Sequence, residues 1–177
     1  MKRTGARPTE ADVDGADGSD GAGLGEHGSA AATPRWRFGS GELTAADVEA
    51  VLARNWWGTL ATSVDGQPYG VPIVYGYDGE HFYVASAPGR KVDAVEANPS
   101  VTLTVVEVAP DASGWSSVIV FGSVEFVREP AGYLRALKAL RGQRGYAGSV
   151  SPADAARMAR ARVLRITPSE ITGRTKE

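Results

Sequence analysis

Arg90 and Lys91 are adjacent cations that directly follow a glycine, and their place in the chain suits a phosphate group. Residues 82–86 predict a strand that ends in small residues, and the residues after Lys91 predict an amphipathic helix. A helix N-terminus offers unpaired backbone N–H groups and the positive end of the helix dipole. Two cations there would add charge-assisted hydrogen bonds to an anion. The alternative is a pair of ordinary solvated charges, which describes most Arg-Lys pairs.

Other residues that could carry chemistry are scarce in this sequence. There is no cysteine, which excludes disulfides, thiolate metal sites and a cysteine nucleophile. The two histidines are His27 and His81, and neither forms a credible nucleophile and base pair, which disfavours a hydrolase. We interpret His81 as a solvated strand residue and expect no metal site. The pattern G-x-G-x-x-G at residues 23–28 has no strand before it, so it does not predict dinucleotide binding.

Composition limits the class of protein. The chain has 177 residues, of which 42% are hydrophobic, and this fits one domain with a sizeable core. A net charge of −2 disfavours nucleic acid or an anionic membrane surface as a partner. No apolar run approaches the roughly 20 residues that span a bilayer. We therefore expect a cytoplasmic protein.

Residues 1–34 differ from the rest of the chain. They contain seven glycines and six acidic residues but few apolar side chains. Such a segment cannot bury enough surface to offset its ordering entropy. We expect a disordered tail over residues 1–34 and a folded domain over residues 35–177.

The folded part is predicted to be mainly β with short helices. Predicted strands cover residues 57–64, 68–77, 81–86, 101–108, 115–128 and 162–171. Helices are expected after Thr44 as N-cap, after Gly89, from Pro130, and after Ser151 as N-cap. Gly122 is expected to mark a bend or bulge. Six mostly antiparallel strands favour a closed or nearly closed barrel, since closure removes exposed edges.

A family resemblance rests on motifs in a fixed order. They are GTLAT (58–62), DGQPYGVPIVYGYDGEHFYVASAPGRK (65–91), ANP (97–99) and WSSVIVFGSVEFV (115–127). From about residue 43 to 171 the chain resembles the pyridoxamine 5′-phosphate oxidase-like FMN-binding split-barrel proteins, near the nitroimidazole-resistance reductases. The resemblance implies a six-stranded antiparallel split β-barrel, FMN as cofactor, and a homodimer with cofactor sites at the subunit interface.

The resemblance also implies a set of site residues. Those around Arg90 would hold the FMN phosphate, the GTLAT strand would run along the flavin ring, and Trp115 with its neighbours would lie near the ring. Tyr69 or Tyr75 would border the substrate space, and Trp56 and Trp57 with one of these tyrosines could complete a site in the partner subunit. The alternative for the aromatic residues is packing in the core or at an interface, which is the more common role of such side chains; it applies to Trp56, Trp57, Tyr75 and Phe121. The implied cofactor-binding residues are Gly58, Thr59, Leu60, Ala61, Thr62, Ala85, Ser86, Arg90, Lys91, Trp115, Ser116 and Ser117.

The implied function is an FMN-dependent oxidoreductase that passes hydride from a reduced nicotinamide to a small electron-poor or aromatic acceptor. Two departures limit it. Ala85 stands where nitroimidazole-reductase relatives commonly have histidine, and the C-terminal ITPSEITGRTKE lacks the pattern of true pyridoxamine 5′-phosphate oxidases. The alternatives are a deazaflavin-dependent reductase of the same fold, or a non-catalytic module that binds flavin or haem.

Overall fold

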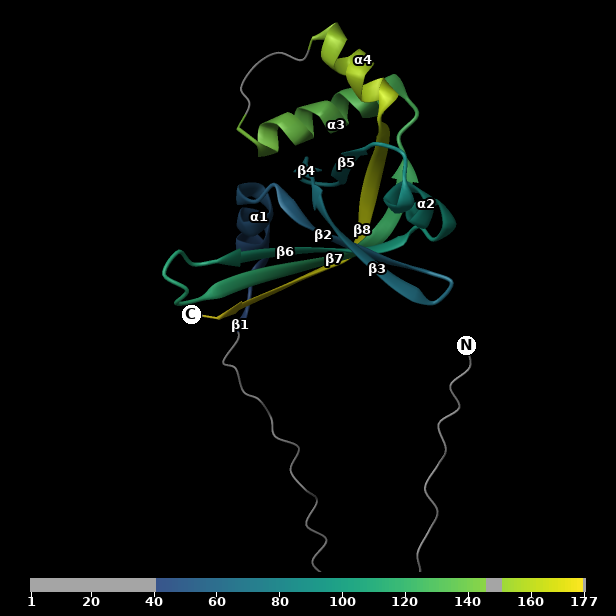
Figure 1. The fold of residues 1–177 in the computed structure, drawn as a ribbon. Coiled ribbons are helices and arrows are strands. Elements are labelled where there is room, and N and C mark those ends of the chain that lie inside the picture. The colour runs from purple at the N-terminus through teal and green to yellow at the C-terminus, as the bar shows by residue number, and fades with distance from the viewer. Residues whose placement is uncertain (1–40, 146–150, 177) are drawn as a thin grey trace, which may run out of the picture. The chain divides into compact units, whose positions relative to one another are not determined.

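One curled antiparallel sheet dominates the structure, a computed structural model that describes residues 41–145 and 151–176. The predicted tail and its glycine motif lie outside the described residues. The eight strands of the described ranges are β1 (Gly41–Glu42), β2 (Trp57–Val64), β3 (Gln67–Val74), β4 (Gly76–Tyr77), β5 (Phe82–Ser86), β6 (Ser100–Val108), β7 (Trp115–Phe126) and β8 (Arg162–Lys176). Their order is β3-β2-β6-β7-β8-β5-β4, and β1 pairs with the end of β8 (Figure 1).

The two ends of this sheet are consecutive in the chain. β3 pairs with β2, β4 pairs with β5, and only Tyr75 separates β3 from β4. The amide of Tyr75 donates to the carbonyl of Trp56 at 3.0 Å, which continues the β2–β3 ladder. The predicted strand 68–77 is therefore divided between two neighbours, and this division brings the sheet edges together. The finding confirms the split barrel. The divided strand and the two-residue β1 together explain why the described ranges contain eight strands where six were predicted.

Most predicted strand boundaries lie within two residues of the observed ones. The main difference is β8, which was predicted to end at Ile171 and continues to Lys176. Its last residues pair with the first half of β7, from Trp115 to Ile119, and with β1. The last residues of β8 are a strand because they pair with β7 and β1, and not because they have an alternating apolar pattern. The β7–β8 register shifts opposite Gly122, where a bend or bulge was expected, but the extra residue of this bulge is Ser169 of β8.

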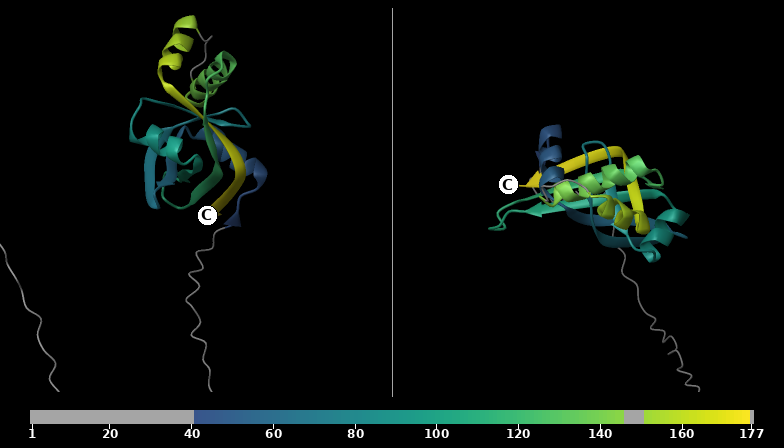
Figure 2. Two further views of the ribbon diagram at one scale, coloured as in Figure 1. Left: turned by 90° about the vertical axis from the view of Figure 1, so that its right-hand side faces the viewer. Right: turned by 90° about the horizontal axis from the view of Figure 1, so that it is seen from above.

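Four helices accompany the sheet in the described ranges: α1 (Ala45–Arg54), α2 (Arg90–Ala97), α3 (Pro130–Gln143) and α4 (Pro152–Arg160). Thr44 and Ser151 are N-caps, as predicted, and each forms a capping box with an aspartate three residues on. Two views show α3 and α4 together at the β4–β5 end of the sheet (Figure 2). None of the described helices is long and apolar enough to cross a membrane.

Two apolar clusters form the core of the described ranges. The larger one fills the barrel and includes Leu60, Tyr75, Leu103 and Val120. The smaller one lies beneath α3 and α4 and consists of Tyr83, Val127, Ala136, Leu137, Ala139, Met158 and Val163. At Gly76 a Cβ atom would lie only 2.3 Å from the amide nitrogen of Leu140. The backbone of α3 therefore packs directly on β4, which requires glycine at that position.

Gln143 joins three elements at their ends. Its Nε2 donates to the carbonyl oxygens of Leu52, Ala53 and Asn55, where α1 ends. Its Oε1 accepts from the amide of Tyr77 at 3.2 Å. The last carbonyl groups of a helix lack partners within the helix. Gln143 satisfies two of them, those of Leu52 and Ala53, and ties α1 to α3 and β4.

Candidate functional site

The junction between β5 and α2 has the form expected of an anion site. Gly89 is the N-cap of α2, with a φ of 145° that favours glycine, and no side chain caps this helix. The carbonyl of Gly89 accepts from the amides of Val92 and Asp93. Within the described ranges no acceptor is found for the first two helical amides. These amides lie where the helix dipole attracts an anion.

The two cations of this junction have different surroundings. Arg90 is exposed, and its Cζ lies 4.9 Å from the ring centroid of Tyr69, in a cation–π contact. Lys91 is half-buried, and this burial lowers its pKa. Among the described residues neither cation forms an ion pair. A bound phosphate would supply the counter-charge that Lys91 lacks.

Ser86 and Ala85 end β5 beside these cations. Ser86 is buried, and its hydroxyl donates to the carbonyl of Ala87 at 2.9 Å. That bond occupies the only proton that this hydroxyl can donate. Ala85 is exposed and pairs with Val163 of β8. Ser86 thus shapes the loop in this state, and a direct bond to an anion requires its hydroxyl to rotate.

The GTLAT strand presents its residues alternately to two faces. Gly58 and Leu60 are buried, and the Leu60 side chain belongs to the barrel core. Thr59 is exposed, and Ala61 is partly exposed on the same outer face. The hydroxyl of Thr62 lies 3.0 Å from the carbonyl of Ser100 and is hydrogen-bonded to it. Thr59 thus has the more accessible hydroxyl, while Leu60 can offer only its backbone to a ligand.

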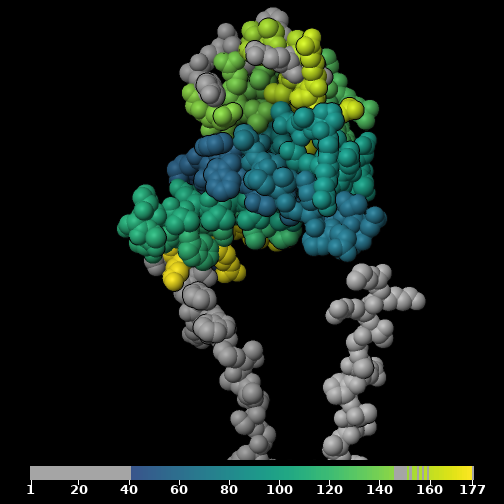
Figure 3. Space-filling view, in the orientation of Figure 1, coloured from purple at the N-terminus to yellow at the C-terminus, as the bar shows by residue number. Residues whose placement is uncertain are grey.

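Ala61 and Thr62 line a surface cavity of about 480 Å³ on the sheet. Tyr69 and Arg90 line a different cavity of about 310 Å³. Trp115 and Ser116 line a third one of about 350 Å³ at the β6–β7 hairpin, which stands out from the body in Figure 3. The structure therefore does not gather the predicted residues around one cavity of a single chain.

The third cavity is bordered by paired side chains. Arg54 and Glu107 form a salt bridge of 3.0 Å at its edge. The hydroxyl of Ser116 donates to the hydroxyl oxygen of Thr175 at 3.2 Å. Ser117 lies one residue further along β7, paired with Val106. The Trp115–Ser117 segment thus belongs to the free end of the hairpin.

The two tyrosines expected near a substrate have different positions. Tyr69 borders the cavity that Arg90 also lines. Tyr75 has no exposed surface, and its hydroxyl donates to the carbonyl of Leu52 at 3.0 Å. Burial raises its pKa. Tyr75 therefore does not border an open substrate space, and the alternative that it packs in the core is confirmed, because the bend between β3 and β4 turns its side chain inward.

The outer face of β2, β6 and β7 was not predicted as a surface feature. Strand alternation and register place Trp57, Val106, Val108 and Phe121 on this face. All four are exposed, Trp57 by 50% and Val108 by 59%. The alternating pattern predicted two faces for each strand. Which of the two faces is exposed to solvent depends on the helices and strands that pack against the other one.

Comparison with known families agrees with this fold. A family model described as pyridoxamine 5′-phosphate oxidase matches residues 44–175. The chain belongs to this family. The resemblance inferred from the sequence motifs is thereby confirmed over almost the same residues.

Solved structures of similar proteins share the fold of this member of the pyridoxamine 5′-phosphate oxidase family. An FAD-binding protein of Mesorhizobium loti is 31% identical, with a TM-score of 0.63 over 78% of this chain and 99% of that one. A candidate 5-nitroimidazole antibiotic resistance protein of Bacteroides thetaiotaomicron is 21% identical, with a TM-score of 0.62 over 77% of this chain and 87% of that one.

A curated relative of Rhizobium meliloti, itself uncharacterised, is 40% identical over 76 residues. This match covers 43% of the chain and 50% of that relative, so the chain matches half the length of the curated protein.

Proposed function

We propose that this protein is an FMN-dependent oxidoreductase that transfers hydride from a reduced nicotinamide to a small electron-poor or aromatic acceptor. The observation that carries the proposal is Lys91, a half-buried cation without an ion-pair partner in the described chain, beside the uncapped N-terminus of α2. An unpaired, partly desolvated charge destabilises a protein unless a ligand compensates it. The FMN phosphate is such a ligand.

The donors at this junction fit a phosphate monoester. The first two amides of α2 and the ammonium of Lys91 would bind the phosphate, and Arg90 would approach from the Tyr69 side. Thr59 and the backbone around Leu60 would contact the ring system along β2. When bound, FMN supplies a ring that accepts and donates hydride, and the chain supplies position and electrostatics. The FAD-binding name of the Mesorhizobium loti protein supports a flavin ligand.

A second copy of the chain would complete the site. In one chain Trp115 and Ser116 line a different cavity from Arg90 and Tyr69. The open outer face with Trp57, Val106 and Phe121 lies on the strands between these cavities, and such apolar patches mark interfaces. We propose a homodimer through this face, which would bring Trp115 of one subunit near the flavin of the other.

Dimer formation is tested by sedimentation velocity of the full chain. We expect the wild type to sediment as a dimer and Val106→Glu as a monomer, because a charge would be buried in the interface. The matched control is Leu134→Glu, since Leu134 is an exposed apolar residue on α3. A monomeric wild type would contradict the shared site.

The cofactor proposal is tested by the absorbance spectrum after purification with added FMN and desalting. We expect retained flavin bands in the wild type and their loss in Arg90→Ala/Lys91→Ala. The control is Arg135→Ala/Lys138→Ala, which removes two exposed cations of the same types from α3. A colourless wild type would reject FMN and favour the deazaflavin alternative.

Turnover is tested separately on protein that retains flavin. Oxidation of a reduced nicotinamide in the presence of nitroaromatic or quinone acceptors would support the oxidoreductase. A bound flavin that no nicotinamide reduces would favour the non-catalytic module instead.

A further inference from the structure

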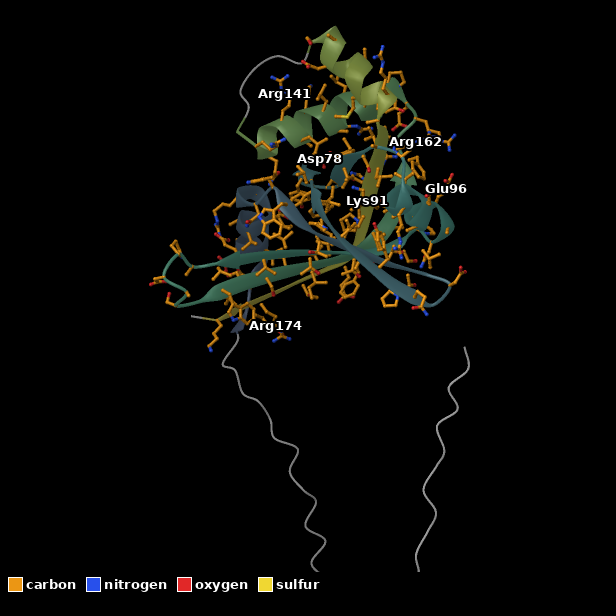
Figure 4. All side chains as sticks on the ribbon, in the orientation of Figure 1. Asp78, Lys91, Glu96, Arg141, Arg162 and Arg174 are labelled. Carbon is orange, nitrogen blue, oxygen red and sulfur yellow. The ribbon has the colours of Figure 1, made fainter. Side chains whose placement is uncertain are left out.

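A cavity of about 250 Å³ lies where β7 ends and β8 begins, next to α3 and α4. Three arginines line it: Arg128 after β7, Arg160 at the end of α4 and Arg162 at the start of β8. We call it the arginine pocket. Figure 4 shows Arg162 at the α4 end of β8, opposite the end that carries Arg174. None of the sequence motifs pointed to this pocket.

The arginine pocket has no neutralising carboxylate. Its lining includes no acidic residue, and in the described part of the chain none of its three arginines forms an ion pair. Two glutamates lie nearby in sequence, but Arg165 binds both, at 2.7 Å to Glu125 and 3.3 Å to Glu129. The positive charge of the pocket is therefore uncompensated.

The sequence around the pocket strengthens this excess. Residues 128–165 contain nine lysines and arginines but two acidic residues, in a chain with a net charge of −2. The basic side chains are thus concentrated in the segment that carries α3 and α4. Such a local field raises the concentration of anionic ligands near the pocket and their rate of association, while the pocket arginines themselves hold the ligand.

The shape and lining of the pocket suit a diphosphate. Its volume lies below the roughly 300 Å³ from which pockets for drug-sized ligands begin. Guanidinium groups bind phosphate oxygens through pairs of parallel hydrogen bonds. Tyr133 and Phe126 are half-buried and offer aromatic surface at the edge, on which a base can stack.

The pocket adjoins the junction assigned to the flavin phosphate. Pro88, in the loop between β5 and α2, lines the pocket. Arg162 pairs directly with Ser86 across the β5–β8 ladder. Cationic groups thus flank this loop, with Arg162 near its start and Lys91 just after its end.

We propose that the arginine pocket binds the diphosphate of an adenine dinucleotide. The dinucleotide is either a flavin whose first phosphate lies at Lys91 or the reduced nicotinamide that donates hydride, so the choice of ligand rests on the proposed function. The pocket itself requires only the adenosine diphosphate group. The nicotinamide dinucleotide would present both phosphates to Arg128, Arg160 and Arg162, whereas the flavin, with its first phosphate at Lys91, would present its second phosphate there.

The test compares ADP, FMN and FAD binding to the full chain by calorimetry. The variant Arg128→Gln/Arg162→Gln removes two pocket charges, and Arg135→Gln removes an exposed arginine of α3 outside the lining. We expect ADP to bind the flavin-free wild type and the Arg135→Gln control alike. The double variant should bind ADP at least about tenfold more weakly, since each lost charged hydrogen bond exceeds the equivalent of a factor of ten.

Two further titrations identify the source. ADP that binds FMN-saturated protein supports the nicotinamide dinucleotide. Three results together support the dinucleotide flavin. FAD binds the wild type about tenfold more tightly than FMN does, the double variant binds both equally, and ADP competes with FAD for the wild type. ADP binding without any flavin binding would support the pocket and reject the proposed FMN function. Failure of ADP to bind, or ADP and FAD affinities that the double variant leaves unchanged, would overturn the proposal.

Discussion

Arg165 on β8 and Lys91 on α2 are both partly buried cations, but their surroundings differ. Arg165 binds two carboxylates, and these hydrogen bonds raise its pKa. Lys91 has no ion-pair partner among the described residues, and burial lowers its pKa. The ion pairs of Arg165 stabilise the fold, whereas the partly buried charge of Lys91 destabilises it. The difference teaches that charges without partners, rather than charges as such, indicate a binding site.

The largest expected effect is on flavin affinity. Lys91→Met should weaken FMN binding by about 10- to 100-fold, because hydrogen bonds to charged groups contribute about 1.5–3 kcal/mol. The same variant should melt no earlier than the wild type when both are ligand-free, because it removes a desolvated charge. Fluorescence quenching of FMN and a thermal melt measure the two quantities. A lower melting temperature with unchanged FMN affinity would make Lys91 structural.

Arg165→Gln should have the opposite profile. We expect its free energy of unfolding to fall by about 1 kcal/mol, since the carboxylate partners are half-exposed and solvent screens the pair. Its FMN affinity should equal that of the wild type. Urea denaturation measures the loss, and Arg128→Gln serves as the control, with an expected change within about 0.5 kcal/mol. Equal stability losses in both variants would remove the distinction between paired and unpaired arginines.

Tyr69→Leu sharpens the contrast between Arg90 and Lys91. The ring of Tyr69 holds the Arg90 guanidinium in a cation–π contact, which contributes about 0.5–1 kcal/mol at an exposed site. Without the ring we expect FMN affinity to fall by about two- to fivefold. Tyr69→Phe keeps the ring and should bind like the wild type. If Tyr69→Phe loses as much affinity as Tyr69→Leu, then the hydroxyl rather than the ring matters.

The smallest expected effect is a pH dependence of stability. Burial lowers the pKa of Lys91 below 10.5 in the folded chain. The unfolded chain then binds more protons between the two pKa values, so the free energy of unfolding rises with pH in that window. Urea midpoints at about pH 8 and about pH 10 should show this gain in the ligand-free wild type but not in Lys91→Met. An equal slope in both proteins would assign the effect to other groups.

Local sequence signals predicted local structure well. Thr44 and Ser151 cap helices because each carries its own aspartate partner three residues away. The β5–α2 junction was predicted because Gly89, Arg90 and Lys91 are neighbours in sequence. Each of these features depends on a few consecutive residues, so distant parts of the chain could not alter it.

Features that depend on distant contacts were predicted less well. The sequence left Tyr75 with two roles, near a substrate or in the core, and the division of its strand between β2 and β5 directs it into the core. Trp115 was grouped with Arg90 by resemblance, and within one chain they line different cavities. Neither outcome is encoded in the spacing of the residues.

The sequence by itself determined the strand and helix types, the bulge opposite Gly122 and the cationic junction at Lys91, because propensity, turn chemistry and capping act over a few residues. Only the tertiary structure decided which charges have partners. Arg128 and Arg162 are 34 positions apart in the sequence, with α3 and α4 between them. They become neighbours because β7, which precedes these helices, pairs with β8, which follows them. Whether a cation meets a carboxylate depends on chain packing, and packing is set by the burial of the whole core rather than by the charges themselves.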